Sequence, residues 1–188
     1  ELGALLAFSA IKNNDKVGLI IFTDQIEKFV PPRKGRGHVL RLIREILFFE
    51  PKRTGTDVAG ALEYLNRVVR RKSVVFLISD FLSEDFHRPL QVANRRHDLI
   101  AVKISDPRES RFDDVGLIEL EDAETGEVYV IDTGSKEFRR EYAARADEDL
   151  GRLEREFRLI NLDFINIRTD QPYIKPLIAF FRSRERRL

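Results

Sequence analysis

Residues 73–85 read Ser-Val-Val-Phe-Leu-Ile-Ser-Asp-Phe-Leu-Ser-Glu-Asp, and this stretch decides the fold. Every residue from Val74 to Ile78 is apolar, and a polar cluster follows at once. An unbroken apolar run of this length is typical of a strand buried on both faces, as in a parallel sheet. Ser79 and Asp80 are then the last residues of that strand. Ligands bind at this edge of open parallel sheets, because strand-to-helix loops and helix N-termini meet there.

The composition predicts one soluble globular domain over residues 1–188. Hydrophobic residues make up 43% of the chain and charged residues 35%, and no apolar run approaches the ~20 residues of a membrane helix. The 33 Lys and Arg nearly balance the 32 Asp and Glu, giving a net charge of +1. The surface as a whole is therefore not built for nucleic acid. The absence of Cys excludes disulfides, Cys-ligated zinc and thiol catalysis.

The first residues bear on localisation. The chain opens Glu1-Leu2-Gly3, with no initiator Met and no signal-peptide pattern. A chain without Cys fits a reducing compartment, so we expect a cytoplasmic domain. We also expect the sequence to be a segment of a longer protein, which leaves open a tether to a membrane through a segment upstream of Glu1.

Apolar periodicity predicts alternating helices and strands along the chain. Helical spacing is found at 2–12, around 39–46, and at 57–70, 85–96 and 135–160, with a last helix after Asp170. Strand patterns are found at 17–22, 26–30, 74–79, 99–105 and 163–168. We expect Pro31-Pro32 to end the second strand, because proline lacks the N–H that a ladder needs.

This order predicts an α/β fold with a doubly wound, mainly parallel sheet, helices on both faces and one antiparallel edge strand. Two further strand patterns, Gly116–Leu120 and Val128–Ile131, flank a turn signal at Thr125-Gly126. They predict a β-hairpin inserted at about residues 111–133.

Two other polar features are expected to lie on the surface. Residues 33–37, Arg-Lys-Gly-Arg-Gly, could hold phosphate, but their glycines match neither the Walker A spacing nor the dinucleotide fingerprint. A solvated turn is the favoured interpretation. The three histidines are scattered without metal-ligand spacing, and we expect His87 and His97 to be surface residues.

Two polar clusters are expected at the same edge of the sheet. Thr54-Gly55-Thr56-Asp57 leads into a helix, and Ser79-Asp80 ends the buried strand. Their hydroxyl and carboxylate oxygens are ligands that Mg²⁺ takes, although two ligands alone are too few. Thr56 or Asp57 is also placed to cap the helix, and capping alone would explain both residues.

Three stretches resemble the von Willebrand factor A fold. They read Asn-Asp-Lys-Val-Gly-Leu-Ile-Ile-Phe at 14–22, Gly-Thr-Asp-Val-Ala-Gly-Ala-Leu at 55–62 and Leu-Ile-Ser-Asp at 77–80. More closely, Phe-Val-Pro-Pro-Arg-Lys-Gly at 29–35 and the helix after it are similar to the bacterial domain-of-unknown-function family 58. The resemblance covers about residues 1–110 well and the remainder loosely.

The resemblance implies a metal-ion-dependent adhesion site built from three loops. Thr56 matches the Thr of the second loop and Asp80 the Asp of the third, with Asp57 as an alternative ligand. The implied ion is Mg²⁺, or else Mn²⁺ or Ca²⁺. The Asp-x-Ser-x-Ser motif of the first loop and the central strand before it are absent from this sequence, so the implied site is incomplete here.

The resemblance further implies a non-catalytic protein-interaction module, in which the ion keeps one position open for a carboxylate of a partner protein. Members of this type are linked with MoxR-type AAA+ ATPases, which implies a role in protein assembly. The expected partner-binding residues are Thr54, Gly55, Ser79 and Phe81.

Two other functions stay open. One is a Mg²⁺-dependent phosphoryl-transfer hydrolase that uses Asp80 as nucleophile or ligand, although the sequence contains no Asp-x-Asp-x-Thr stretch, Walker motif or nucleophile elbow. The other is a scaffold whose metal site has decayed.

Overall fold

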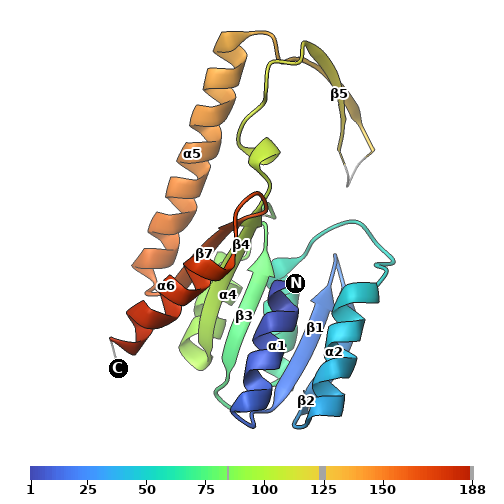
Figure 1. The fold of residues 1–188 in the computed structure, drawn as a ribbon, viewed down its shortest axis with the longest axis vertical. Coiled ribbons are helices and arrows are strands. Elements are labelled where there is room, and N and C mark those ends of the chain that lie inside the picture. The colour runs from blue at the N-terminus through green and yellow to red at the C-terminus, as the bar shows by residue number, and fades with distance from the viewer. Residues whose placement is uncertain (84, 123–125, 187–188) are drawn as a thin grey trace. The chain divides into compact units, whose positions relative to one another are not determined.

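The computed structural model describes residues 1–83, 85–122 and 126–186 (Figure 1). The chain forms two compact units, one of residues 1–70 with 83–93 and one of residues 71–82 with 94–188. The single domain predicted over residues 1–188 depends on how these units combine, and it stays a prediction.

The elements follow one another in an order close to the predicted one. They are α1 (Leu2–Lys12), β1 (Val17–Phe22), β2 (Ile26–Arg33), α2 (Arg36–Phe48), α3 (Val58–Val68), β3 (Val74–Ser79), α4 (His87–Arg96), β4 (Asp98–Ser105), a 3₁₀ turn (Pro107–Glu109), β5 (Leu117–Glu121), β6 (Val128–Asp132), α5 (Lys136–Leu159), β7 (Asp163–Arg168) and α6 (Ile174–Glu185).

The first unit is built on the antiparallel pair β1 and β2. The prediction that β2 ends before Pro31-Pro32 is wrong, because the strand continues to Arg33. In the described residues β2 has only β1 as a neighbour, and a strand at a sheet edge can lack N–H donors on its outer side. Since α2 already begins at Arg36, the predicted loop is reduced to Lys34 and Gly35.

Helices α2 and α3 bury the stripes that their sequences predict. Both helices pack on β1, and α3 also packs on β2, where the rings of Phe29 and Tyr64 meet edge to face with centroids 5.7 Å apart. Burying one Val or Leu side chain of these two helices stabilises the fold by about 1.5–3 kcal/mol. The buried residues of the two helices are Val39, Leu42, Val58, Ala61, Leu62 and Leu65.

The second unit contains the parallel sheet β3-β4-β7, whose strands run side by side in the same direction (Figure 1). The central strand β4 is fully buried from Leu99 to Val102, as a strand covered on both faces should be. Both α5 and α6 pack on β7. Arg184 of α6 joins two strands, since its guanidinium pairs with Asp163 of β7 at 3.1 Å and with Asp98 of β4.

The predicted β-hairpin is present as β5 and β6, with Ile118 opposite Ile131 and Leu120 opposite Tyr129. Thr125 of the predicted turn lies outside the described residues. The helix predicted after Ser135 is confirmed, because the Ser135 hydroxyl accepts a hydrogen bond from the Phe138 N–H at 3.2 Å and so caps α5.

The fold is thus a mixed α/β arrangement, in which a parallel three-stranded sheet is flanked by helices and accompanied by two antiparallel strand pairs. This confirms the predicted α/β class, parallel sheet and hairpin. Among the helices of the described ranges, none combines the length and apolar composition needed to cross a membrane.

The prediction that His97 lies on the surface is wrong, since its side chain is only 2% exposed. His97 directly precedes β4, the central strand of its sheet. Burial disfavours the charged imidazolium and lowers the pKa of His97, and the nearby charge of Arg96 lowers it further. Neither ring nitrogen has a hydrogen-bond partner among the described residues.

Candidate functional site

The first group of predicted site residues, Thr54 to Asp57, lies in the loop before α3 in the first unit. Asp57 is the N-cap of α3, because its Oδ1 accepts a hydrogen bond from the Gly60 N–H at 2.8 Å. Its own N–H donates to the Thr23 carbonyl at 2.8 Å. The predicted capping role is therefore confirmed for Asp57. The side chains of Thr54 and Thr56 are exposed.

Contacts with the β1–β2 turn and with the start of β2 hold this loop in place. The Arg53 guanidinium lies 2.7 Å from the carboxylate of Asp24, and the Lys52 N–H donates to Glu27 Oε1 at 3.3 Å. A Cβ added at Gly55 would lie 3.3 Å from the Cβ of Asp24, so a side chain there would crowd the turn. The loop thus presents the Thr56 hydroxyl from an anchored backbone.

The second group, Ser79 to Leu82, lies where β3 ends in the second unit. The chain turns sharply here, with Phe81 at a φ of 56° in the left-handed region. Two side chains stabilise the turn: Ser79 Oγ accepts from the Phe81 N–H at 3.1 Å, and Asp80 Oδ1 accepts from the Leu82 N–H at 3.2 Å. The Asp80 carboxylate is thereby oriented by its own loop.

Sequence reasoning missed Lys103, which lies beside Asp80. Its ammonium donates a hydrogen bond to the backbone carbonyl oxygen of Asp80. Burial lowers the pKa of Lys103, while the carboxylates of Glu109 and Asp80 oppose that shift. The signal that could have found it is a lysine inside the apolar strand 99–105, which runs beside β3 in the parallel sheet.

The Phe81 ring belongs to the core. Phe81 is 7% exposed, and its ring meets that of Phe157 in α5 edge to face, with centroids 5.4 Å apart. The neighbouring Leu82 is 70% exposed and is the apolar side chain that this loop presents to solvent. The partner contact predicted for Phe81 would therefore involve its backbone, with the Leu82 side chain beside it.

The residues within each unit do not by themselves fit a divalent-cation site. A hard cation takes about six or more oxygen ligands, whereas the Asp80 loop offers one carboxylate with the Lys103 ammonium close by. In the first unit the Asp57 carboxylate is engaged as a helix cap. Within the described ranges, no three His, Cys, Asp or Glu side chains are grouped so that they could hold an ion. An ion at Asp80 would need further oxygen donors.

Comparison with known proteins identifies the family. A family model described as protein of unknown function DUF58 matches residues 1–151. An uncharacterised protein of Mycobacterium bovis and one of Mycobacterium tuberculosis are each 32% identical over 190 residues, covering 97% of this chain. The chain spans 58% of the length of each of these two relatives.

An uncharacterised protein of Mycobacterium avium is 33% identical over 162 residues, which is 84% of this chain and 94% of that protein. A crystal structure of an uncharacterised membrane-spanning protein from Vibrio fischeri covers 98% of this chain and 82% of its own, at 11% identity and a TM-score of 0.27. On the family match and the mycobacterial relatives, the chain belongs to the DUF58 family.

Proposed function

We propose that this chain is a non-catalytic protein-interaction module with a von Willebrand factor A-like fold. The observation that carries the proposal is the Asp80 loop at the carboxyl end of β3. Its own hydrogen bonds orient the Asp80 carboxylate, and the exposed side chain of Leu82 lies two residues away. A fixed carboxylate beside an exposed apolar side chain suits recognition of a protein surface.

Unpaired strand edges support the von Willebrand factor A-like assignment. In the described residues β1 pairs only with β2, and β3 pairs only with β4. We propose that a further strand, which would precede the first helix in such a fold, pairs with the free edges of β1 and β3. Its carboxyl end would bring the Asp-x-Ser-x-Ser oxygens. A structure of the longer protein in which such a strand runs elsewhere would refute the assignment.

The proposed binding mode joins Thr56 and Asp80 to those further oxygens around Mg²⁺, Mn²⁺ or Ca²⁺, with one position open for a partner carboxylate. Asp57 is a weaker candidate ligand, because its carboxylate caps α3. The proposed partner is a MoxR-type AAA+ ATPase, with which the module would act in protein assembly.

Binding between the full-length protein and the MoxR-type ATPase of the same organism tests this proposal, with Mg²⁺ and then with a chelator. Asp80→Ala is expected to abolish Mg²⁺-dependent binding, and Leu82→Ser to weaken it. Asp15→Ala, which changes an exposed carboxylate of the first unit, is the matched control and should bind as the parent does. Binding that survives both chelation and Asp80→Ala would exclude this mode.

A hydrolysis assay distinguishes the hydrolase alternative from the interaction module. ATP and p-nitrophenyl phosphate are offered to the full-length protein with Mg²⁺. Sustained hydrolysis that Asp80→Ala abolishes and Asp15→Ala leaves intact would replace the interaction module with an enzyme. If calorimetry with Mg²⁺ and Mn²⁺ gives no heat of binding and no partner binds, the scaffold function remains.

A further inference from the structure

The segment that contains the hairpin has a charge unlike that of the rest of the chain. Residues 113–134 include eight carboxylates and no Lys, Arg or His, so the segment carries a formal charge of −8. Since the whole chain carries +1, all other residues together carry +9. The eight acidic residues are Asp113, Asp114, Glu119, Glu121, Asp122, Glu124, Glu127 and Asp132.

One face of the hairpin combines these carboxylates with exposed aliphatic side chains. Directly opposed residues of an antiparallel pair point to the same face. Each of the three cross-strand pairs on this face joins one carboxylate to one aliphatic residue. The aliphatic members are largely exposed, Leu117 at 72% and Val130 at 67%. We call it the mixed face, and its pairs are Leu117–Asp132, Glu119–Val130 and Glu121–Val128.

The opposite face and the edges of the hairpin are also suited to a partner. The opposite face is apolar and consists of Ile118, Leu120, Tyr129 and Ile131. A two-stranded hairpin alone is marginally stable in water. In the described part of the chain β5 and β6 pair only with each other, so each strand has one edge whose N–H and C=O groups can receive another strand.

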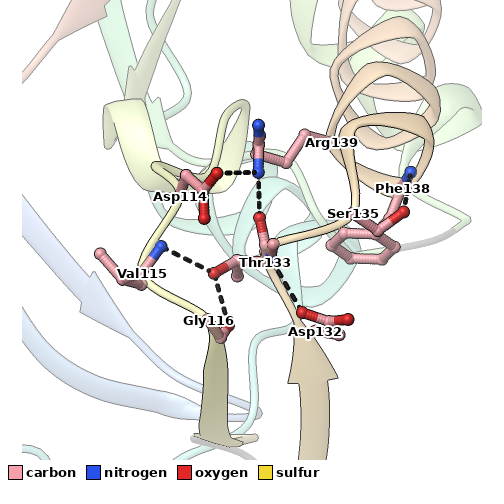
Figure 2. A network of polar contacts seen from close by, with 9 residues as sticks. Asp114, Val115, Gly116, Asp132, Thr133, Ser135, Phe138 and Arg139 are labelled. Carbon is pink, nitrogen blue, oxygen red and sulfur yellow. Dashed lines mark hydrogen bonds and ion pairs between the residues drawn. The ribbon is translucent and has the colours of Figure 1, made fainter.

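The base of the hairpin is firmly fixed (Figure 2). Thr133 is completely buried, and its hydroxyl donates to the Gly116 carbonyl at 2.6 Å and accepts from the Val115 N–H at 3.1 Å. Arg139, in the first turn of α5, pairs with Asp114 at 3.2 Å and donates to the Thr133 carbonyl. These contacts therefore hold the start of β5 and the end of β6 together and fix both to the first turn of α5.

We propose that this hairpin is a docking arm for an extended, basic segment of a partner protein, in which Lys or Arg alternates with apolar residues. A strand added to an edge of the hairpin gains main-chain hydrogen bonds. Added to the edge of β5, a strand that alternates with a period of two places its basic side chains on the mixed face, beside Glu119 and Glu121. Its apolar side chains then lie on the opposite face, beside Ile118 and Leu120.

The negative charge of the hairpin segment disfavours other classes of ligand. A nucleic acid or an anionic lipid surface is repelled by a segment of charge −8. Two hairpins of the same kind repel each other for the same reason, which disfavours pairing arm to arm. This proposal uses none of the residues of the Asp80 loop, so it stands or falls separately from the function proposed above.

The test uses the full-length protein and a fluorescein-labelled ten-residue peptide in which Lys alternates with Val, followed by fluorescence anisotropy. The double variant Glu119→Lys/Glu121→Lys should weaken binding by about tenfold or more, because close opposite charges become like charges. Ile118→Ser/Leu120→Ser, on the opposite face of β5, should weaken it as well. The matched control Glu141→Lys/Glu148→Lys makes the same charge change at exposed positions of α5 and should bind as the parent does.

A second peptide, in which Lys alternates with Ser, separates strand recognition from charge alone. It should bind at least about tenfold more weakly than the Lys–Val peptide, since it has no apolar side chains to contact the opposite, apolar face of the hairpin. Circular dichroism and urea unfolding check that every variant folds. Equal binding of both peptides, or equal loss in the α5 control, would overturn the proposal. So would concentration-dependent self-association lost only in the hairpin variants, which would make a second copy the occupant.

Discussion

The ammonium of Lys103 donates a hydrogen bond to the backbone carbonyl oxygen of Asp80, so a strand residue of β4 holds the loop that ends β3. The two strands run parallel, with Ser79 opposite Lys103. The lysine is therefore bound to the backbone of residue 80, whereas the carboxylate of that residue is bound to the Leu82 N–H.

This relationship predicts a contrast between two substitutions. Lys103→Met leaves the Asp80 carbonyl without its donor and should lower the free energy of unfolding by about 1–3 kcal/mol. Asp80→Asn keeps both the carbonyl and a side-chain oxygen for the Leu82 N–H, so its effect should stay within about 0.5 kcal/mol. Urea unfolding of both variants measures the difference, and similar losses would show that the lysine interacts mainly with the carboxylate.

The Thr133 hydroxyl should determine how stably the hairpin strands β5 and β6 are held together. Thr133→Val removes the hydroxyl that bonds Gly116 and Val115 and keeps the volume, so it should cost about 1–3 kcal/mol. Thr133→Ser keeps the hydroxyl and is the control. Hydrogen exchange of the amides in β5 and β6 should quicken in the valine variant and change much less in the serine variant. Unchanged exchange in both would mean that the base does not depend on this hydroxyl.

Two helical glycines should respond to alanine with opposite signs. A Cβ at Gly60 would collide with the Asp57 carboxylate, whose Cγ lies 3.0 Å away, so Gly60→Ala should disrupt the cap and destabilise the protein by about 0.5–2 kcal/mol. Gly151 lies inside α5, and its Cβ would meet only the flexible end of Arg155 at 3.4 Å. Gly151→Ala should stabilise the protein by about 0.5–1 kcal/mol. Thermal unfolding compares them, and a gain at both sites would show that the cap tolerates a side chain.

His97 should make stability depend on pH. Its native pKa is lowered, chiefly by burial, so the unfolded chain binds the proton more readily. The stabilisation from neutral His97 is complete above the ordinary pKa of about 6.5 and is lost as the pH falls towards the lower native value. Urea unfolding from pH 8 to pH 5 should therefore show a decline, which His97→Leu reduces.

The stability difference between the parent and His97→Leu at pH 8 reports packing alone, because the histidine is neutral there in both states. Subtracting this difference from the differences measured at lower pH leaves the part of the stability that depends on protonation of His97. One proton contributes at most about 1.4 kcal/mol per pH unit to the slope. Equal slopes in the parent and the variant would show that His97 is protonated in the native protein as readily as in the unfolded chain.

Most elements could be predicted because their patterns are local. The run from Val74 to Ile78 predicted β3, and the position of Ser135 before an amphipathic helix predicted the cap of α5. The expectation that β3 is buried on both faces is wrong at its ends, since Val74 is 59% and Ile78 37% exposed. The burial of His97 could not be predicted, because a single histidine between a helix and a strand carries no periodic pattern that would indicate burial. The same holds for the pairing of Lys103 with the Asp80 carbonyl, since a lysine in a strand is usually read as an edge residue.

At the candidate site, the spacing narrowed the helix cap to Thr56 or Asp57, of which the structure shows Asp57, and it placed Asp80 at a strand end. The inward turn of the Phe81 ring did not, because it depends on the left-handed backbone at that residue and on the ring of Phe157. The metal-binding role of Thr56 and Asp80, which came from resemblance, stays a prediction.

The continuation of β2 through Pro31 and Pro32 has a consequence for polymerisation. Gly18 makes room for it, since a Cβ there would lie 3.0 Å from both the Pro32 ring and the Val30 carbonyl. Successive N–H groups of a strand point to opposite edges, so one of the two prolines leaves the outer edge of β2 without a donor for a strand arriving from another molecule. The outer edge of this pair therefore offers a poor template for fibril growth at its end, and replacing both prolines with valine would open that edge to it.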